Sequence, residues 1–213
     1  MRNYRNRRNY ENLQLRIFDG VGDYGIPQIE PCAYSGGIDW IGFNYANSCK
    51  DKSGKGVHFF IDDYQFNRVW TNIDRYIPLL KQFQYVLSPD FSTYTDFPKA
   101  IQIYNHYRKH WVAAYMQQAG ISVIPTISWS RKDSFSWCFD GEPRESTVAV
   151  SSVGCMNNEE AKNLFLDGYF QMIDKLNPEK IIFYGQVPDE CTGNIVRVKA
   201  FCEKFKEATL GLW

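Results

Sequence analysis

The chain has 213 residues, and its 24 Lys+Arg balance its 24 Asp+Glu, so the formal net charge is zero. This balance argues against a protein that binds polyanions over its whole surface and against an acidic mimic. The length suits one large domain with a full core, and no run of about 18 apolar residues predicts a membrane span.

The N-terminal residues 1–16 form a basic arm with five Arg and one Glu, and they lack the apolar segment of a secretory signal. Two interpretations stay open: a solubilising terminus, or an arm that contacts nucleic-acid phosphates. The six cysteines are scattered without a CxxC pair. This usage, with no Cys/His cluster, predicts reduced thiols in a cytoplasmic protein and argues against a zinc site.

Residues 17–213 are predicted to form a single α/β domain. Its first part, residues 17–56, is a β-rich lead-in in which residues 39–45 are the best strand candidate. Five apolar runs then predict strands, at residues 57–61, 85–87, 121–127, 147–150 and 180–183. Each run ends in a group of polar and aromatic residues.

Helices are predicted between most of these strands. They cover residues 72–83 with a bend at Pro78, 96–118 with Asp96 as the cap and Gly120 as the stop, 157–176, and 194–208. The third strand leads instead into a long loop, residues 128–143, rich in aromatic side chains. We expect this loop to form a folded cover over the strand ends.

This alternation predicts a mostly parallel sheet with right-handed crossover helices. We favour a compact or incomplete TIM-barrel-like fold, because the polar groups follow every strand; a Rossmann-like three-layer sheet is the alternative. In both folds the carboxyl ends of the strands are where ligands bind.

Four carboxylates follow predicted strands or turns at this edge, and they are the candidate catalytic residues: Asp62, Asp63, Asp90 and Asp140. Asp62 and Asp90 are the candidate ligands for Mg²⁺ or Mn²⁺, which prefer carboxylate oxygens and would activate water for phosphate-ester hydrolysis. Alternatively, two of these carboxylates could act as general acid and general base without a metal, as in glycoside hydrolysis. Helix caps and turn braces are the plain structural interpretation.

The remaining polar and aromatic residues near this edge are candidate ligand-binding groups. Ser92, Ser151 and Ser152 offer hydroxyls that could bind phosphate or sugar oxygens. Tyr94, Trp129 and Tyr184 offer rings that could stack on a base, and Arg108 offers a guanidinium that could offset negative charge. Packing within the fold is the alternative for each. His106 and His110 have metal-ligand spacing on a helix, but without an HExxH motif we interpret them as part of an exposed or packed helix face.

Several sequence segments together resemble a family of uncharacterised proteins, domain of unknown function 4417. They include His58-Phe59-Phe60-Ile61-Asp62-Asp63, Pro89-Asp90-Phe91-Ser92, Trp137-Cys138-Phe139-Asp140-Gly141 and Val150-Ser151-Ser152-Val153-Gly154. The resemblance covers roughly residues 57–185 and implies an intracellular protein of a bacteriophage or another mobile element. It implies no catalytic residue.

Two functions follow as hypotheses. The first is a metal-dependent enzyme acting on a nucleotide or nucleic-acid phosphate. The second is a non-enzymatic binding protein that engages a host protein or sequesters a small ligand through the aromatic loop, with a homo-oligomer as one form. A weaker third is a DNA-binding accessory protein that uses the basic arm.

Overall fold

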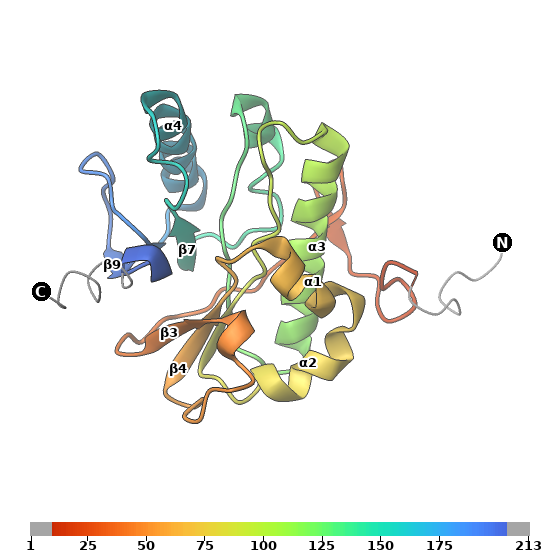
Figure 1. The fold of residues 1–213 in the computed structure, drawn as a ribbon. Helices are drawn as coiled ribbons and strands as arrows, with labels where there is room; N and C mark the ends of the chain where they lie inside the picture. The colour runs from red at the N-terminus through yellow and green to blue at the C-terminus, as the bar shows by residue number, and fades with distance from the viewer. Residues whose placement is uncertain (1–9, 204–213) are drawn as a thin grey trace, which may run out of the picture.

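A computed structural model describes residues 10–203 of the protein, and within this range seven parallel strands form two hydrogen-bonded groups (Figure 1). The first group is β3 (Asp39–Gly42), β4 (Lys55–His58), β5 (Tyr85–Leu87) and β6 (Val123–Ile124). The second is β7 (Thr147–Ser151), β8 (Lys180–Tyr184) and β9 (Ile195–Val198). A short antiparallel hairpin, β1 (Gly20–Val21) and β2 (Ile26–Pro27), precedes them.

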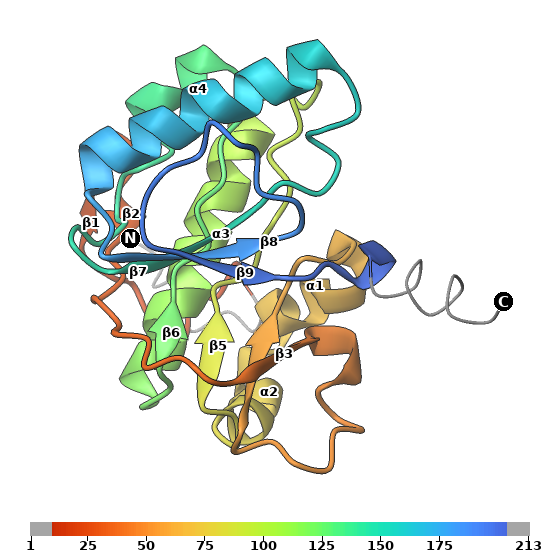
Figure 2. The same cartoon turned by 90° about the vertical axis from the view of Figure 1, so that its left-hand side faces the viewer.

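The two groups are joined through the backbone just after β6. Thr126 forms a parallel bridge with Ala149 of β7, flanked by 2.8 Å bonds from Ile127 N to Ala149 O and from Ala149 N to Pro125 O. The strands therefore follow one another in chain order, and the predicted parallel arrangement is confirmed. Figure 2 shows the second group crossing the first steeply. No pairing within the described residues joins β9 to β3, so no barrel is closed.

Side chains alternate along the strands, and each face of the sheet has its own core. Val86, Val148 and Ile181 belong to the two cores on the helix-covered side. Their neighbours on the opposite face form a third cluster, which takes members from both strand groups: Trp40, Tyr85, Leu87, Ile124, Ala149 and Ile182. The sheet therefore curves so that its inner face packs on itself.

Four helices cover the outer side of the sheet. α1 (Asp63–Thr71), α2 (Ile73–Leu80) and α3 (Lys99–Gln118) pack on the first group, and α4 (Glu159–Leu176) packs on the second. α3 stops where predicted, because Gly120 takes a φ of +83° that favours glycine. α4 stops at Asn177, also in the left-handed region, as predicted. Its start is capped by Asn158, which accepts from Ala161 N at 2.8 Å.

Four predictions about elements were wrong. The helix expected over residues 194–208 is strand β9 at its start, residues 201–203 are helical, and residues 204–208 lie outside the described residues. α1 lies in a stretch for which no helix was predicted, and α3 begins after Pro98 with no side-chain cap, so Asp96 is not its cap. The aromatic loop is folded, but Trp137 and Phe139 pack in the outer core with α4 and do not cover the strand ends.

The end of the basic arm lies against the first helical layer. Asn12 Nδ2 donates to Trp70 O at 2.8 Å, and Trp111 Nε1 donates to Arg16 O at 3.0 Å. Residues 1–9 of the predicted arm lie outside the described residues. Within residues 10–203, no helix has the length and apolarity that crossing a membrane requires.

Candidate functional site

Asp63 and Ser92 form the best-defined polar contact near the carboxyl ends of the first strand group. Asp63 is the first residue of α1, and Ser92 lies on the segment after β5. The Asp63 carboxylate accepts from Ser92 N at 3.1 Å and from Ser92 Oγ at 2.7 Å. Two donors fix the orientation of this carboxylate, yet lone pairs remain on its oxygens for a further partner.

Asp90 lies on the same segment, close enough to Asp63 for the two carboxylates to interact. Its side chain is half-buried and makes no hydrogen bond or ion pair with any residue from 10 to 203. Burial raises the pKa of Asp90 to about 7; the Lys109 ammonium opposes the rise and the Asp63 carboxylate adds to it. Asp90 is therefore a carboxyl group with free oxygens that exchanges its proton near neutral pH.

The other two predicted carboxylates do not join this pair. Asp62, the residue before α1, is exposed and accepts a 3.4 Å bond from Gln65 of that helix. Asp140 lies against the β1–β2 hairpin, where a Cβ on Gly22 would come within 2.0 Å of its Oδ2. Burial raises the pKa of Asp140, and Lys175 opposes that rise. Of the four candidates, only Asp63 and Asp90 are brought together.

Arg108 is engaged in holding the first helices and the β5 segment together. Its guanidinium donates to Asn67 Oδ1 at 2.9 Å and to Asn105 Oδ1 at 2.6 Å, and it lies 4.0 Å from the centre of the Phe91 ring. Asn105 in turn donates to Ser92 O at 2.6 Å. This network fixes the position of Ser92, so Arg108 supports the Asp63 contact from behind.

The two candidate serines after β7 are used by their own loop. Ser151 Oγ accepts from Val153 N at 3.2 Å. Ser152 is buried, and its Oγ donates to Gln186 O at 2.6 Å. Both hydroxyls hold the loops that follow β7 and β8.

The three candidate stacking rings differ in accessibility. Tyr184 is buried between Phe60, at a 4.9 Å centroid distance, and His58, at 4.6 Å. Trp129 lies on Gly168 of α4, where an added Cβ would come within 2.2 Å of the indole. Tyr94 is 60% exposed, the most of the three, and its ring meets the Phe97 ring edge to face at a centroid distance of 5.1 Å.

A second polar cluster, the enclosed cluster, lies inside the protein between α3 and the loop before β7. It consists of His106, Lys109, His110 and Glu142. Glu142 Oε1 accepts from Lys109 Nζ at 2.6 Å and lies 3.0 Å from His110 Nε2, and Lys109 Nζ also donates to Thr126 O at 2.8 Å. Side-chain exposure is 1% for Lys109 and 0% for both His110 and Glu142.

Burial and charge act against each other in this cluster. Burial alone would raise the pKa of Glu142, but the Lys109 ammonium and His110 bring it below its usual range. Burial lowers the pKa of His110 against the opposing effect of Glu142, and burial also lowers that of His106. Glu142 is therefore an ionised carboxylate in the interior, with Lys109 as its counter-charge.

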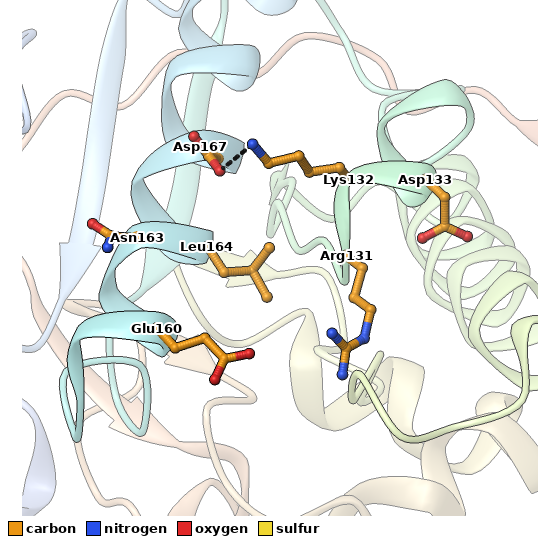
Figure 3. Close-up of a pocket in the computed structure, with 7 residues that line it drawn as sticks. All are labelled: Arg131, Lys132, Asp133, Glu160, Asn163, Leu164 and Asp167. Atoms are coloured by element: carbon orange, nitrogen blue, oxygen red, sulfur yellow. Dashed lines mark ion pairs between the residues drawn. The ribbon is translucent and has the colours of Figure 1, made fainter.

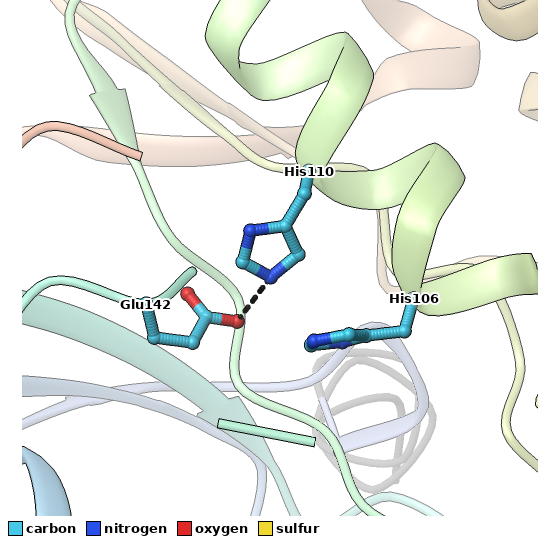
Figure 4. Close-up of side chains that lie close together, drawn as sticks. All are labelled: His106, His110 and Glu142. Carbon is cyan, nitrogen blue, oxygen red and sulfur yellow. Dashed lines mark hydrogen bonds and ion pairs between the residues drawn. The ribbon is translucent and has the colours of Figure 1, made fainter. Parts of the chain in front are cut away.

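Figure 4 shows the His106 ring directed toward the space between the His110 ring and the Glu142 carboxylate. One ligand atom from each of these three residues lies within 4.8 Å of the others. His106 Nδ1 and Glu142 Oε2 are buried and have no hydrogen-bond partner among the described residues. The arrangement has the composition of a two-histidine, one-carboxylate metal site.

A hollow of about 610 Å³ lies elsewhere, between the 3-10 helix η3 (Lys132–Ser136) and α4 (Figure 3). Charges of both signs line it, and an ion pair of 2.9 Å joins Lys132 to Asp167 there. Since two basic and three acidic side chains line it, the hollow has no strong preference for anionic or cationic ligands. None of the residues predicted for the site lines it.

Sequence reasoning missed Lys109 and Glu142. The four-residue spacing of His106 and His110 was a recognisable signal in the sequence. The carboxylate that lies beside them belongs to a loop residue 32 positions after His110. The interpretation of both histidines as part of an exposed or packed helix face left their burial open, and the structure shows both of them packed inside. It overlooked that their ring nitrogens converge on a carboxylate.

Comparison with known proteins gives one family and two relatives. The family described as Domain of unknown function (DUF4417) matches residues 18–202. The Gene 1 protein of Mycobacterium phage L5 is 39% identical over 181 residues, which cover 84% of this chain and 79% of the relative. The Gene 1 protein of Mycobacterium phage D29 is 34% identical over 200 residues, covering 90% and 72% respectively. No solved structure gives a significant match.

Proposed function

The chain belongs to the DUF4417 family, whose description assigns no activity, and we propose that it is a metal-dependent enzyme acting on a nucleotide or nucleic-acid phosphate. The reaction centre in this proposal is the strand-end pair, Asp63 and Asp90. One observation carries it: Asp90 is a half-buried carboxyl group without a partner among residues 10–203, beside a second carboxylate at the ligand-binding edge of a parallel sheet.

A divalent cation would neutralise the negative charge that this pair of carboxylates carries when ionised. Two neighbouring carboxylates repel each other when both are ionised, which is part of the reason why the pKa of Asp90 is raised to about 7. Mg²⁺ or Mn²⁺ between Asp63 and Asp90 would offset that repulsion and accept lone pairs from the free carboxylate oxygens as its ligands. The ion would also polarise a phosphoryl oxygen and lower the pKa of a bound water.

The surrounding residues suit a phosphate ester with a base attached. Ser92 holds Asp63 in place and is itself held by Asn105, so a bound cation would have a fixed ligand on that side. Tyr94 lies two residues beyond Ser92 and is 60% exposed, so its ring offers a stacking face for a base. We therefore assign Asp63 and Asp90 to the cation and Tyr94 to the base.

The fold supports the same location. Strands in chain order, each parallel to the next, with an inner face that packs on itself, are features of an incomplete barrel of the TIM type rather than a three-layer sheet with helices on both faces. In such barrels the groups after the strands converge on one rim. Asp63 and Asp90 follow neighbouring strands, β4 and β5.

The test is a thermal-unfolding titration with Mg²⁺ and Mn²⁺, with and without nucleotides, on the wild-type chain, Asp90→Asn and Asp140→Asn. A ligand at 100 times its Kd stabilises a protein by about 2.7 kcal/mol. We expect a cation-dependent rise in Tm for the wild type and for Asp140→Asn, and none for Asp90→Asn. Equal Tm shifts in all three proteins would rule out a cation site at the strand ends.

Absence of any shift would favour the alternative hypothesis, a non-enzymatic protein that binds a host protein or a small ligand. That alternative assigned binding to the aromatic loop. Trp137 and Phe139 are buried, while Trp129 and Phe135 are half-buried. A binding protein would therefore need another surface.

A further inference from the structure

We propose that His106, His110 and Glu142 form a second metal site, enclosed in the interior and suited to Zn²⁺. This inference is independent of the strand-end cation proposed above. It rests on three converging donor atoms, on the hydrogen bonds that orient them, and on two buried atoms that otherwise have no partner.

The geometry brings the donors within reach of one ion. One ligand atom from each residue lies within 4.8 Å of the others, and His106 is only 1% exposed. Zn²⁺ bonds of about 2.0–2.2 Å to nitrogen and oxygen place ligand atoms roughly 3–4 Å apart, so small side-chain rotations suffice. His106 and His110 are four residues apart on α3 and share one face of that helix.

Hydrogen bonds to backbone carbonyls select the tautomer of each histidine. His110 Nδ1 lies 2.8 Å from Pro27 O, and His106 Nε2 lies 3.1 Å from Asp140 O. A carbonyl oxygen only accepts, so these two nitrogens carry protons. The lone pairs are therefore on His110 Nε2 and His106 Nδ1. Histidines that bind metals usually donate their second ring N–H to such an acceptor.

Without a cation, the cluster has three unfavourable features. His106 Nδ1 and Glu142 Oε2 are buried without a hydrogen-bond partner in the described part of the chain. His110 Nε2 faces Glu142 Oε1 at 3.0 Å, and both atoms are acceptors unless an additional proton lies between them. One divalent cation would accept lone pairs from His106 Nδ1, His110 Nε2 and Glu142 Oε2, so each of these atoms would gain a partner.

Lys109 sets the strength of the site. Its ammonium pairs with Glu142 Oε1 at 2.6 Å and leaves Oε2 for the metal. The same positive charge repels an added cation in a medium of low dielectric. We therefore expect Lys109→Met, which keeps the length of the side chain and removes its charge, to bind Zn²⁺ more tightly than the wild type.

The choice of Zn²⁺ follows from the ligand types. Imidazole nitrogens with one carboxylate suit a borderline-soft ion, whereas Mg²⁺ prefers an all-oxygen set and keeps several waters. The three residues are fully enclosed, so this ion would link α3 to the loop before β7 and would hold that loop against β2.

The test uses the full-length protein purified without chelator, stripped with a chelator, and then titrated with Zn²⁺ by calorimetry and with Co²⁺ by visible absorption. We expect one equivalent of Zn²⁺ and a Co²⁺ spectrum typical of low coordination number. His106→Gln and Glu142→Gln should each weaken Zn²⁺ binding at least tenfold. Asp90→Asn should retain it, which separates this site from the strand-end pair.

Lys109→Met keeps the proposal falsifiable if the ligand variants do not fold, because it leaves all three ligands in place. Tighter Zn²⁺ binding by this variant than by the wild type supports the site. The proposal is overturned if neither the wild type nor Lys109→Met takes up Zn²⁺ or Co²⁺ after stripping. It is equally overturned if both histidine and glutamate variants fold and bind Zn²⁺ as the wild type does.

Discussion

The enclosed cluster and the strand-end pair both contain carboxylates near Lys109, yet their surroundings are opposite. Glu142 is fully enclosed and already has a cation and a histidine as neighbours. Asp90 is half-buried and has no such partner within residues 10–203. Burial with a counter-charge produces an ionised group committed to structure, whereas burial without one produces a group that titrates near neutral pH. Of the two carboxyl groups, only Asp90 is in partial contact with solvent.

The largest expected effect is loss of the Glu142 charge. Glu142→Gln leaves the Lys109 ammonium buried without its counter-charge, and breaking a buried pair in this way costs about 3–5 kcal/mol. Urea unfolding in the presence of a chelator measures the change. A loss below about 1 kcal/mol would mean that the cluster is hydrated in solution, and the contrast with the strand ends would disappear.

Asp90→Asn should act in the opposite direction and depend on pH. The folded pKa of about 7 exceeds the ordinary 3.8, so the native state binds more protons than the unfolded state between these values, and stability falls as pH rises through this window. Asparagine removes that loss. We expect the variant to be more stable by about 2 kcal/mol at pH 8 without cations, a value reduced for solvent contact.

The same comparison at pH 4 should give almost no difference, because Asp90 is then protonated in the native state. Unfolding free energies measured across pH 4–8 therefore test the assignment. A difference that does not change with pH would indicate that Asp90 is ionised throughout. Adding Mg²⁺ should narrow the gap at pH 8, since the proposed ion stabilises the wild type only.

A smaller effect is expected from the hydroxyl that orients the strand-end pair. Ser92→Ala removes the 2.7 Å bond to Asp63 Oδ1 and keeps the bond from Ser92 N. We expect a loss of about 1 kcal/mol, typical of one hydrogen bond to a charged group on a partly exposed surface. Ser136→Ala is the matched control, because its hydroxyl bonds to Asp133 O in an exposed turn. Equal losses in both variants would count against a special role for Ser92.

Much of the fold was predictable from the sequence. The apolar runs predicted the strands, and the long connections between them predicted the parallel order. β9 was missed because Val198 lies at helical spacing from Phe201 and Phe205, so the segment was interpreted as an amphipathic helix. The segment is a strand because it pairs with β8, and this long-range contact cannot be predicted from the local sequence.

The site was predicted less well, and the turn at residues 139–142 shows why. Asp140 and Glu142 flank Gly141, whose φ of +77° bends the chain where a Cβ would come within 2.5 Å of Pro27 O. This turn directs Glu142 into the interior and Asp140 toward the β1–β2 hairpin. Both acids follow the same aromatic stretch in the sequence, so only the packing against β2 distinguishes the buried Glu142 from the half-buried Asp140.

The smallest effect is expected at the surface, where a pair of the same chemical type as Lys109–Glu142 lies in water. Lys132 and Asp167 are 2.9 Å apart, and their side chains are 74% and 44% exposed. Solvent screens this pair, so Asp167→Asn should change the unfolding free energy by less than about 0.5 kcal/mol. Urea unfolding beside Glu142→Gln measures both pairs under one condition. If the two substitutions cost the same, charge pairing alone would explain the enclosed cluster, and its burial would have no energetic consequence.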